Sequence, residues 1–207
     1  MNRINNFLMN SSTYRKSFLA GIIFSLLLLG ACATNIRSSV QTNPPPGEAF
    51  SNFTAFEMKP ATLAPAFARR ASNKNALARI QENLSDAMTP VLRDWNQAGA
   101  AKGGTARTLV IEPVVTQIKF VGTSGRFRAG SMAGSSAVIM DMNISEKETG
   151  EVIATPEFYA KASAWGGSFT LGATDNMMLS RIAQQVKNYL TANYAAAVGG
   201  PSGAGAQ

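Results

Sequence analysis

The sequence predicts an α+β fold, in which a single domain holds a mainly antiparallel sheet of about four strands and packs two helices on one face of it. Two stretches, residues 73–96 and 174–194, place apolar side chains three or four positions apart, which is the spacing of amphipathic helices. Residues 136–145 alternate apolar and polar side chains, which is typical of a strand with one buried face. Because three strand-like stretches lie between the helices, we expect a meander at the centre of the sheet.

Residues 53–58 alternate weakly and predict the first strand, which Lys59 and Pro60 end. Phe50, Phe53 and Phe56 also stand at helical spacing, so this strand depends on the alternation alone. We expect the three phenylalanines to be buried in the core; the alternative is an exposed apolar edge.

The first helix is expected between Asn73 and Asn96, where one stripe of apolar residues is spaced by threes and fours. Pro90 lies inside this stretch, and a proline removes one helical hydrogen bond and restricts the residue before it. We therefore expect a kink at Pro90 or a break into two pieces. The apolar stripe consists of Leu77, Ile80, Leu84, Met88, Val91, Leu92 and Trp95.

Residues 108–121 are rich in branched side chains and predict a long strand. Pro113 inside it donates no hydrogen bond to a neighbouring strand, which favours an edge position or a bulge. The next strand, residues 136–145, is expected to bury Val138, Met140, Met142 and Ile144.

A turn at residues 146–151, in which Gly150 supplies a positive φ, is expected to lead into a strand at residues 152–162. Pro156 again favours a bulge or an edge position.

The second helix is expected to begin at Thr174 or Asp175, either of which can cap it, and to end near Tyr194. Its apolar stripe consists of Met178, Leu179, Ile182, Val186, Tyr189 and Leu190, and we expect Met177 to fill the core as well.

An apolar run at residues 18–32 follows Arg3, Arg15 and Lys16, with no acidic residue before it, which is the pattern of a secretory signal peptide at residues 1–31. The run is shorter than the ~20 residues of a membrane-spanning helix. Its end, Leu29-Gly30-Ala31-Cys32, resembles the lipobox of bacterial lipoproteins. That resemblance implies cleavage between Ala31 and Cys32 and multiple acylation of Cys32. The alternatives are an ordinary signal peptide, which leaves a free thiol, and an uncleaved anchor.

Three further segments complete the predicted organisation. Residues 32–49 are polar and contain three consecutive prolines, which predicts a stiffened tether behind the acylated cysteine. Residues 50–194 are of the usual size for one domain. Residues 195–207, rich in glycine and alanine, predict a disordered tail.

Composition narrows the chemistry. Of the 19 Lys and Arg residues three precede Cys32, so the mature chain carries 16 against 12 Asp and Glu, a net charge of about +4. The charges form no basic stripe among aromatic residues, which argues against nucleic acid as a partner. With no histidine and a single cysteine, we expect no cofactor, no metal site and no catalytic residues.

A glycine-rich loop at residues 122–136 is the candidate binding element. Glycine amides beside two guanidinium groups suit a phosphate or a sulfated sugar, but the loop precedes a strand and lacks a P-loop ending. The structural alternative is a flexible connection or a close backbone crossing. As a partner-docking loop it offers Arg126, Phe127, Arg128, Gly130, Met132 and Gly134.

Four carboxylates, Asp141, Glu146, Glu148 and Glu151, surround the predicted turn. Carboxylate pairs perform general acid–base catalysis, but no nucleophile or base accompanies these residues. We therefore expect them to be solvated.

Three segments together resemble a family of uncharacterised bacterial lipoproteins: Arg128–Ser136, Val138–Asn143 and Glu148–Ile153. The shared pattern is a glycine-rich loop, an alternating strand, a Thr-Gly-Glu turn and a second strand. The family brings no assigned activity. More loosely, the layout is similar to small α+β domains of accessory lipoproteins. Because Ala33 replaces the aspartate that implies inner-membrane retention, the resemblance favours the outer membrane, facing the periplasm.

The sequence thus predicts a non-enzymatic, membrane-anchored envelope lipoprotein that docks another envelope protein or associates with itself. Two alternatives stay open. One is a periplasmic enzyme that processes a glycan or lipid through carboxylates such as Asp141 and Glu157. The other is a carrier that binds a lipid or glycan in an apolar cavity between helices and sheet.

Overall fold

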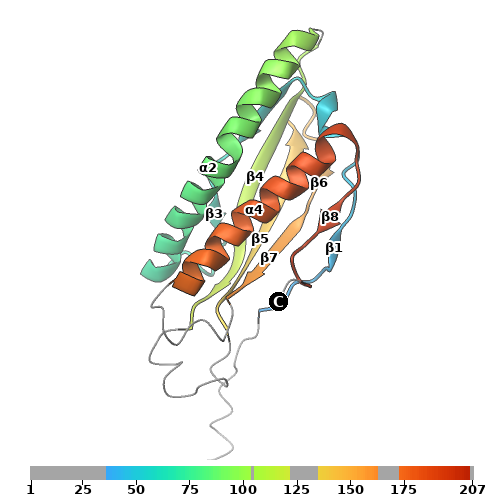
Figure 1. Cartoon of the computed structure of the whole chain (residues 1–207). Coiled ribbons are helices and arrows are strands. Elements are labelled where there is room, and N and C mark those ends of the chain that lie inside the picture. Colours follow the sequence, from blue (N-terminus) through green and yellow to red (C-terminus); the bar gives the residue numbers. More distant parts are fainter. Residues whose placement is uncertain (1–35, 104, 122–134, 163–172, 206–207) are drawn as a thin grey trace, which may run out of the picture. The chain divides into compact units, whose positions relative to one another are not determined.

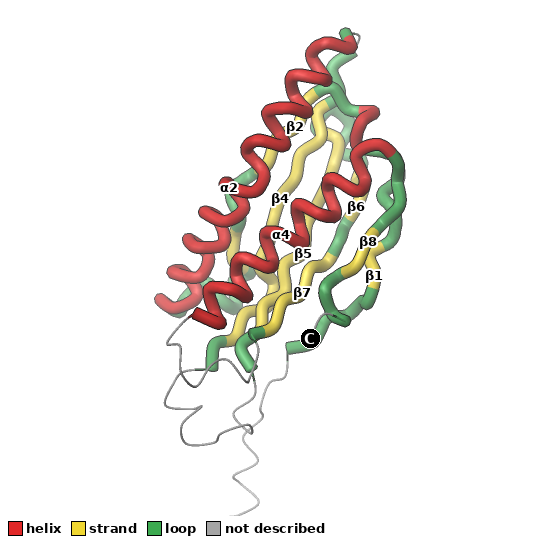
Figure 2. The backbone as a smooth tube through the Cα atoms, in the orientation of Figure 1, coloured by secondary structure: helices red, strands yellow, loops and turns green. Residues whose placement is uncertain are grey.

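Two helices lie on one face of a six-stranded sheet in the computed structural model, which describes residues 36–103, 105–121, 135–162 and 173–205 (Figure 1). The strands follow the order β2-β4-β5-β6, with β3 also beside β4 and β7 also beside β5. Figure 2 shows both helices on the same side of the strands. The predicted α+β class is confirmed, although the sheet has more strands than the four expected.

The first half of the fold is a parallel crossover. β2 (Ala55–Met58) and β3 (Thr62–Leu63) pair in parallel with β4 (Thr108–Lys119), and α2 (Ala71–Lys102) connects them. Parallel neighbours need such a connection, because the chain must return to its starting end.

Pro113 sits in a central strand without breaking it. The carbonyl groups of Ile111 and Val115 accept hydrogen bonds from the amides of Lys59 and Ala64, on the side of β2 and β3. Residues two apart in a strand face the same side, so the nitrogen of Pro113 faces the gap between β2 and β3. Neither the edge position nor a bulge at Pro113 is observed; the register shifts further along, between Val115 and Gln117.

The second half is the expected antiparallel meander. β5 (Ala137–Glu146) pairs with β4, then with β6 (Val152–Ala154) and β7 (Glu157–Lys161). Gly150 has a φ of 75° in the turn, as predicted. The last predicted strand is interrupted before β7 at Pro156, whose carbonyl accepts the amide of Met142.

Helix α2 runs through Pro90 without interruption, so the predicted break into two pieces is wrong. Pro90 lies on the exposed side of the helix, where the carbonyl group that loses its helical partner is accessible to solvent. The opposite side is buried and includes Ile80, Leu84, Met88 and Trp95.

Helix α4 (Ala173–Ala195) buries the predicted stripe, but Met177 is 61% exposed and does not fill the core. Trp95 of α2 stacks on Tyr194 of α4 with ring centroids 4.5 Å apart, and Phe56 of β2 lies 5.1 Å from Trp95. These rings join the two helices and the sheet. Phe50, Phe53 and Phe56 are all buried, as expected.

The predicted tether and tail differ most from the structure. β1 (Thr42–Asn43) pairs antiparallel with β8 (Gly200–Pro201), and the compact unit extends from Asn35 to Gln207. The domain bounds of 50–194 were therefore too narrow, and residues 36–49 and 195–205 belong to the fold.

A buried asparagine turns the chain back after α4. The Asn193 side chain accepts the amides of Val198 and Gly199 at 2.8 Å each and donates to the carbonyl groups of Tyr189 and Gly199. Gly199 adopts a φ of 72°, and a Cβ there would lie 2.5 Å from the Asn43 carbonyl oxygen. Hydrogen bonds from a side chain to the backbone, rather than buried apolar side chains, thus hold the segment after α4 in the fold.

The face of the sheet away from the helices, here called the outer face, is only partly open. Ile36 packs on Ala137, Ile139 and Tyr159 and forms a second small apolar cluster there. Beyond this cluster the outer face carries Glu112, Thr116, Asp141 and Asn143.

Candidate functional site

Two carboxylates stand side by side on the outer face. Asp141 in β5 pairs in register with Glu157 in β7, and the neighbouring residues Met140 and Phe158 point into the helix-covered core. The alternation of a strand places Asp141 and Glu157 on the opposite face. These are the two acids that the sequence suggested for a carboxylate enzyme, and the structure brings them together.

Glu157 is occupied by the segment that follows Cys32. Its Oε1 accepts hydrogen bonds from Ser38 Oγ and, at 2.8 Å, from the Ser39 amide, and its Oε2 accepts one from Ser39 Oγ at 2.8 Å. The Asn43 side chain adds two bonds to the Glu157 backbone, accepting its amide at 2.8 Å and donating to its carbonyl at 2.9 Å. Asn43 therefore acts as a strand residue would along the free edge of β7.

The same edge is closed further along by the C-terminal segment. The Tyr159 amide donates to the Ser202 carbonyl at 2.8 Å, and the Ser202 hydroxyl lies 2.6 Å from the Val40 carbonyl. An unpaired strand edge invites uncontrolled pairing with other chains. Residues from both ends of the chain prevent this at β7.

The pKa values of the two carboxyl groups move in opposite directions. Burial raises the pKa of Asp141, the hydrogen bond from Thr116 opposes this, and the charge of Glu157 adds to the rise. Burial also raises the pKa of Glu157, but the bonds from Ser38 and Ser39 outweigh it, so the net pKa lies below the usual value. Opposite shifts are the mark of an acid–base pair, but here the ionised partner is already bound by hydroxyl and amide groups.

A second charged cluster joins β4, β5 and the chain before Phe50. Arg107 donates to both oxygens of Glu48, at 2.6 and 3.1 Å, and to Glu146 at 2.6 Å, and its guanidinium lies 4.5 Å from the centroid of the Phe53 ring. Its hydrogen bonds lower the pKa of both glutamates.

The acids around the turn are therefore not all solvated as expected. Glu146 is only 5% exposed and pairs with Arg107, and Glu148 accepts the amide of Thr108 at 2.8 Å. Both glutamates connect the turn to residues 107 and 108 at the start of β4, so their role is structural.

A pocket of about 350 Å³ opens between the first turns of the two helices and Phe120. It is open to solvent and five of its eight lining residues are polar or charged, so it differs from the enclosed apolar cavity that a lipid carrier needs. Its lining consists of Ser72, Asn75, Ala76, Arg79, Phe120, Asp175, Asn176 and Leu179.

The remaining site residues lie outside the described part of the chain. This holds for Ala31, Cys32 and the docking loop with Arg126, Phe127, Arg128, Gly130, Met132 and Gly134. Within the described ranges no three His, Cys, Asp or Glu residues gather in a way that would hold a metal ion. Nor does any helix described there have the length and apolar character to cross a membrane.

Comparison with known proteins gives no family. No family model and no curated protein matches the chain. Among solved structures, the PelC dodecamer from Paraburkholderia phytofirmans is 11% identical, covers 69% of this chain and 92% of its own, and has a TM-score of 0.35. A putative lipoprotein from Caulobacter crescentus CB15 is 12% identical, with the same coverage and TM-score. The hypothetical protein CT253 from Chlamydia trachomatis is 11% identical, covers 67% of this chain and 93% of its own, and has a TM-score of 0.33.

Proposed function

We propose that this protein is a lipid-anchored accessory domain of the cell envelope, acylated at Cys32, facing the periplasm from the outer membrane, that docks another envelope component and performs no catalysis. One observation carries the proposal: the chain enters the fold only four residues after Cys32, where Ile36 is 6% exposed. Four residues reach about 14 Å when extended. An acyl group on Cys32 therefore holds a folded domain close to the membrane surface.

The use of Glu157 supports a non-enzymatic role. General acid–base catalysis needs two carboxyl groups that meet the substrate. Both oxygens of Glu157 bind Ser38 and Ser39, so the pair offers a substrate only Asp141. The carboxylate serves to fasten the segment behind the anchor.

The outer face offers a partner a polar surface that neither helix covers. Asn143 is exposed there and donates to Glu112 Oε2 at 3.2 Å. A polar and partly open antiparallel sheet suits a non-obligate protein interface, whose rim is polar. The loop at residues 122–136 remains the second predicted docking element.

The anchor is tested by fatty-acid labelling in cells. The parent protein is expected to carry label and to remain with membranes, and Cys32→Ser is expected to lose both. Each buried methylene contributes about 0.8 kcal/mol of membrane affinity, so loss of the acyl chains releases the domain. Label that persists in Cys32→Ser would exclude acylation at this cysteine.

Docking is tested by a photo-crosslinking side chain at Asn143, with Glu82 on the exposed side of α2 as the matched position. Crosslinks to one defined envelope protein are expected from Asn143 and not from Glu82. Equal capture from both positions, or capture from neither, would contradict docking on the outer face.

A carboxylate enzyme that acts on a glycan or lipid is the second candidate, because Asp141 and Glu157 lie in register with pKa values that diverge. Asp141→Asn separates the two proposals. An enzyme loses its essential acid and with it at least a hundredfold in rate. An accessory domain keeps its crosslinked partner and its cellular function.

A further inference from the structure

We call the end of the domain at which the chain enters the fold, at Ile36, the proximal end. Lys119 of β4 pairs with Ala137 of β5, and Ala137 pairs with Lys161 of β7. Ile36 packs on Ala137. Both helices begin at this end, since Arg181 of α4 donates to the Lys161 carbonyl at 3.1 Å and one pocket joins Ser72, Phe120 and Asp175.

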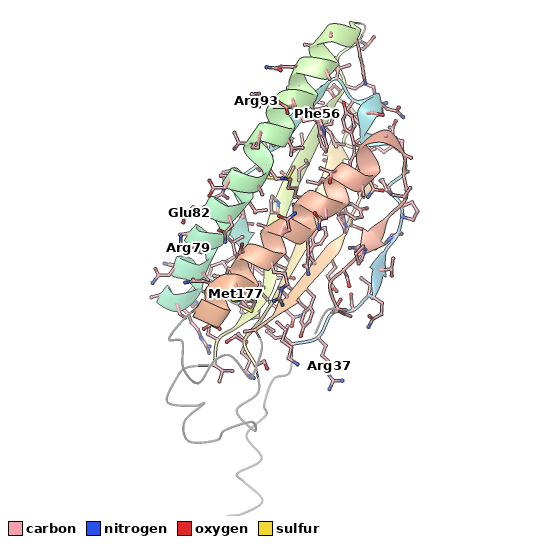
Figure 3. All side chains as sticks on the ribbon, viewed as in Figure 1. Arg37, Phe56, Arg79, Glu82, Arg93 and Met177 are labelled. Carbon is pink, nitrogen blue, oxygen red and sulfur yellow. The ribbon has the colours of Figure 1, made fainter. Side chains whose placement is uncertain are left out.

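Positive charge gathers at the proximal end. Arg37, Arg69, Arg70 and Lys74 are exposed, and Lys119 and Lys161 are half-buried at the last residues of their strands. Asp175 in the first turn of α4 is a carboxylate at this end, and Glu157 lies near Arg37, because it binds the next two residues, Ser38 and Ser39. Figure 3 shows Arg37 and Met177 at the proximal end and Arg93 at the other.

Two features add to this charge. The first turns of both helices direct the positive ends of their dipoles the same way. Met177, 61% exposed in α4, places an apolar side chain there.

The opposite end, here the distal end, is nearly balanced. Its carboxylates are Glu48, Glu57, Asp94, Glu146, Glu148 and Glu151, and its cations are Lys59, Arg93, Lys102, Arg107 and Lys147. Most of these cations are paired: Arg107 with Glu48 and Glu146, and Lys59 and Lys147 with Glu57. The charge of the domain is therefore polarised along the strands.

We propose that the proximal end rests on the anionic headgroups of the membrane that holds the acyl chains, through Arg37, Arg69, Arg70 and Lys74. This inference rests on the proposed acylation of Cys32. The anchor brings this end within about 14 Å of the lipid surface. There each exposed cation strengthens binding to anionic lipid roughly fivefold.

This contact fixes the orientation of the domain. Helix α2 rises from the membrane, and the distal end and the outer face stay accessible to a partner. An acylated domain without the contact would rotate freely about its short link.

The orientation is tested on the acylated protein in vesicles that contain anionic lipid and a nitroxide on the headgroups. Because Cys32 is the sole native cysteine and is acylated, one introduced cysteine is the single thiol that takes a fluorescent label. The label is introduced by Ser72→Cys or by Ala100→Cys. Residue 72 lies in the first turn of α2 and residue 100 near its end, and both are exposed. The two positions are about 42 Å apart along the helix.

Strong quenching is expected at position 72 and little at position 100. Replacing Arg69, Arg70 and Lys74 together by glutamine is expected to abolish the difference, whereas the matched change of Arg93, Lys102 and Lys147 preserves it. High salt is expected to abolish the difference in quenching as well, because it screens the attraction between the cations and the headgroups.

Equal quenching at the two positions, or a difference that persists in neutral vesicles, would overturn the inference about orientation. If the same protein carries fatty-acid label, the anchor itself is upheld. A protein without fatty-acid label would overturn the anchor and this inference together. If the label at position 72 is unquenched by the vesicles and becomes shielded from solvent only when a second protein is added, the cations bind an acidic partner instead.

Discussion

Glu157 and Asn43 join residues more than a hundred positions apart in the chain. Asn43 is 1% exposed and satisfies the amide and carbonyl of Glu157, while the Glu157 carboxylate receives Ser38 and Ser39. A charged acceptor makes such bonds stronger than neutral ones. The two side chains therefore hold the N-terminal segment on the sheet.

Glu157→Ala is expected to lower the free energy of unfolding by about 1 kcal/mol at pH 7, because the Ser38 and Ser39 donors lose a charged partner at a partly exposed site. The pKa of Glu157 is lowered in the fold, so its contribution is present above the pKa of the unfolded chain and is lost as the pH falls through the folded pKa. Urea unfolding at pH 7 and pH 3 measures this difference. Glu151→Ala, an exposed residue of the turn, serves as control, and an equal loss in both variants would refute the contact.

Asp141→Asn is expected to stabilise the protein at pH 7. The pKa of Asp141 is raised above 3.8, so the folded protein binds this proton more tightly than the unfolded chain does, and ionisation at neutral pH costs stability. The cost diminishes as the pH falls through the folded pKa and is gone below the unfolded pKa. Parent and variant should therefore unfold alike at acid pH, in thermal scans across pH. A variant that is less stable at pH 7 would show that ionised Asp141 contributes to the fold.

At the scale of the element, α2 and the chain before β2 lie unusually close. Gly99 in α2 faces the backbone of Thr54, where a Cβ would stand 2.0 Å from the carbonyl oxygen. Asn96 in the preceding turn binds the Phe56 amide at 2.8 Å and its carbonyl at 3.1 Å. The end of the helix is thereby fastened to the first strand.

Gly99→Ala is expected to destabilise the protein by about 2 kcal/mol, because the helix must move away from Thr54. Helix propensity alone favours alanine over glycine by up to about 1 kcal/mol, so the sign of the change in stability distinguishes the close contact with Thr54 from helix propensity. Chemical denaturation measures it. Ala100→Gly, on the exposed side of the same helix, reports propensity without the contact. A stabilising Gly99→Ala would contradict the close approach.

Elements with an apolar period were predictable, and those held by polar bonds were not. The stripe of α4 and the alternation of β5 predict these elements to within one residue, because burial sets their period. The stripe of α2 predicts its start closely, but the helix continues beyond the predicted end at Asn96 to Lys102. The sequence offers Asp141 and Glu157 only as examples of carboxylates for an enzyme, and it is the register of β5 with β7 that places them together. The partners Ser38, Ser39 and Asn43 stand in a polar segment without a period, so nothing local marked them as part of the fold.

For the whole molecule, both ends of the chain complete one domain. The segment after Cys32 covers part of the outer face, and the segment after α4 pairs with it through β1 and β8. This closure leaves three residues, 33–35, between the proposed acylation site Cys32 and Ile36, and the proposed orientation on the membrane requires a link of this kind. If the proposed anchor holds, the placement of the domain at the membrane and its fold depend on the same contact between residues 36–43 and β7.

Amide hydrogen exchange of residues 36–43 and of Ser202, in the acylated protein on membranes, tests this contact most directly. The Ser39 amide, bound to Glu157, and the Ser202 amide, bound to the Gln41 carbonyl, are expected to exchange far more slowly than in a free chain. Glu157→Ala should accelerate exchange at Ser39 while the amides of β5 keep their rate. Exchange of residues 36–43 at the rate of an unstructured chain would contradict the account, because the domain would then hang from a flexible tether.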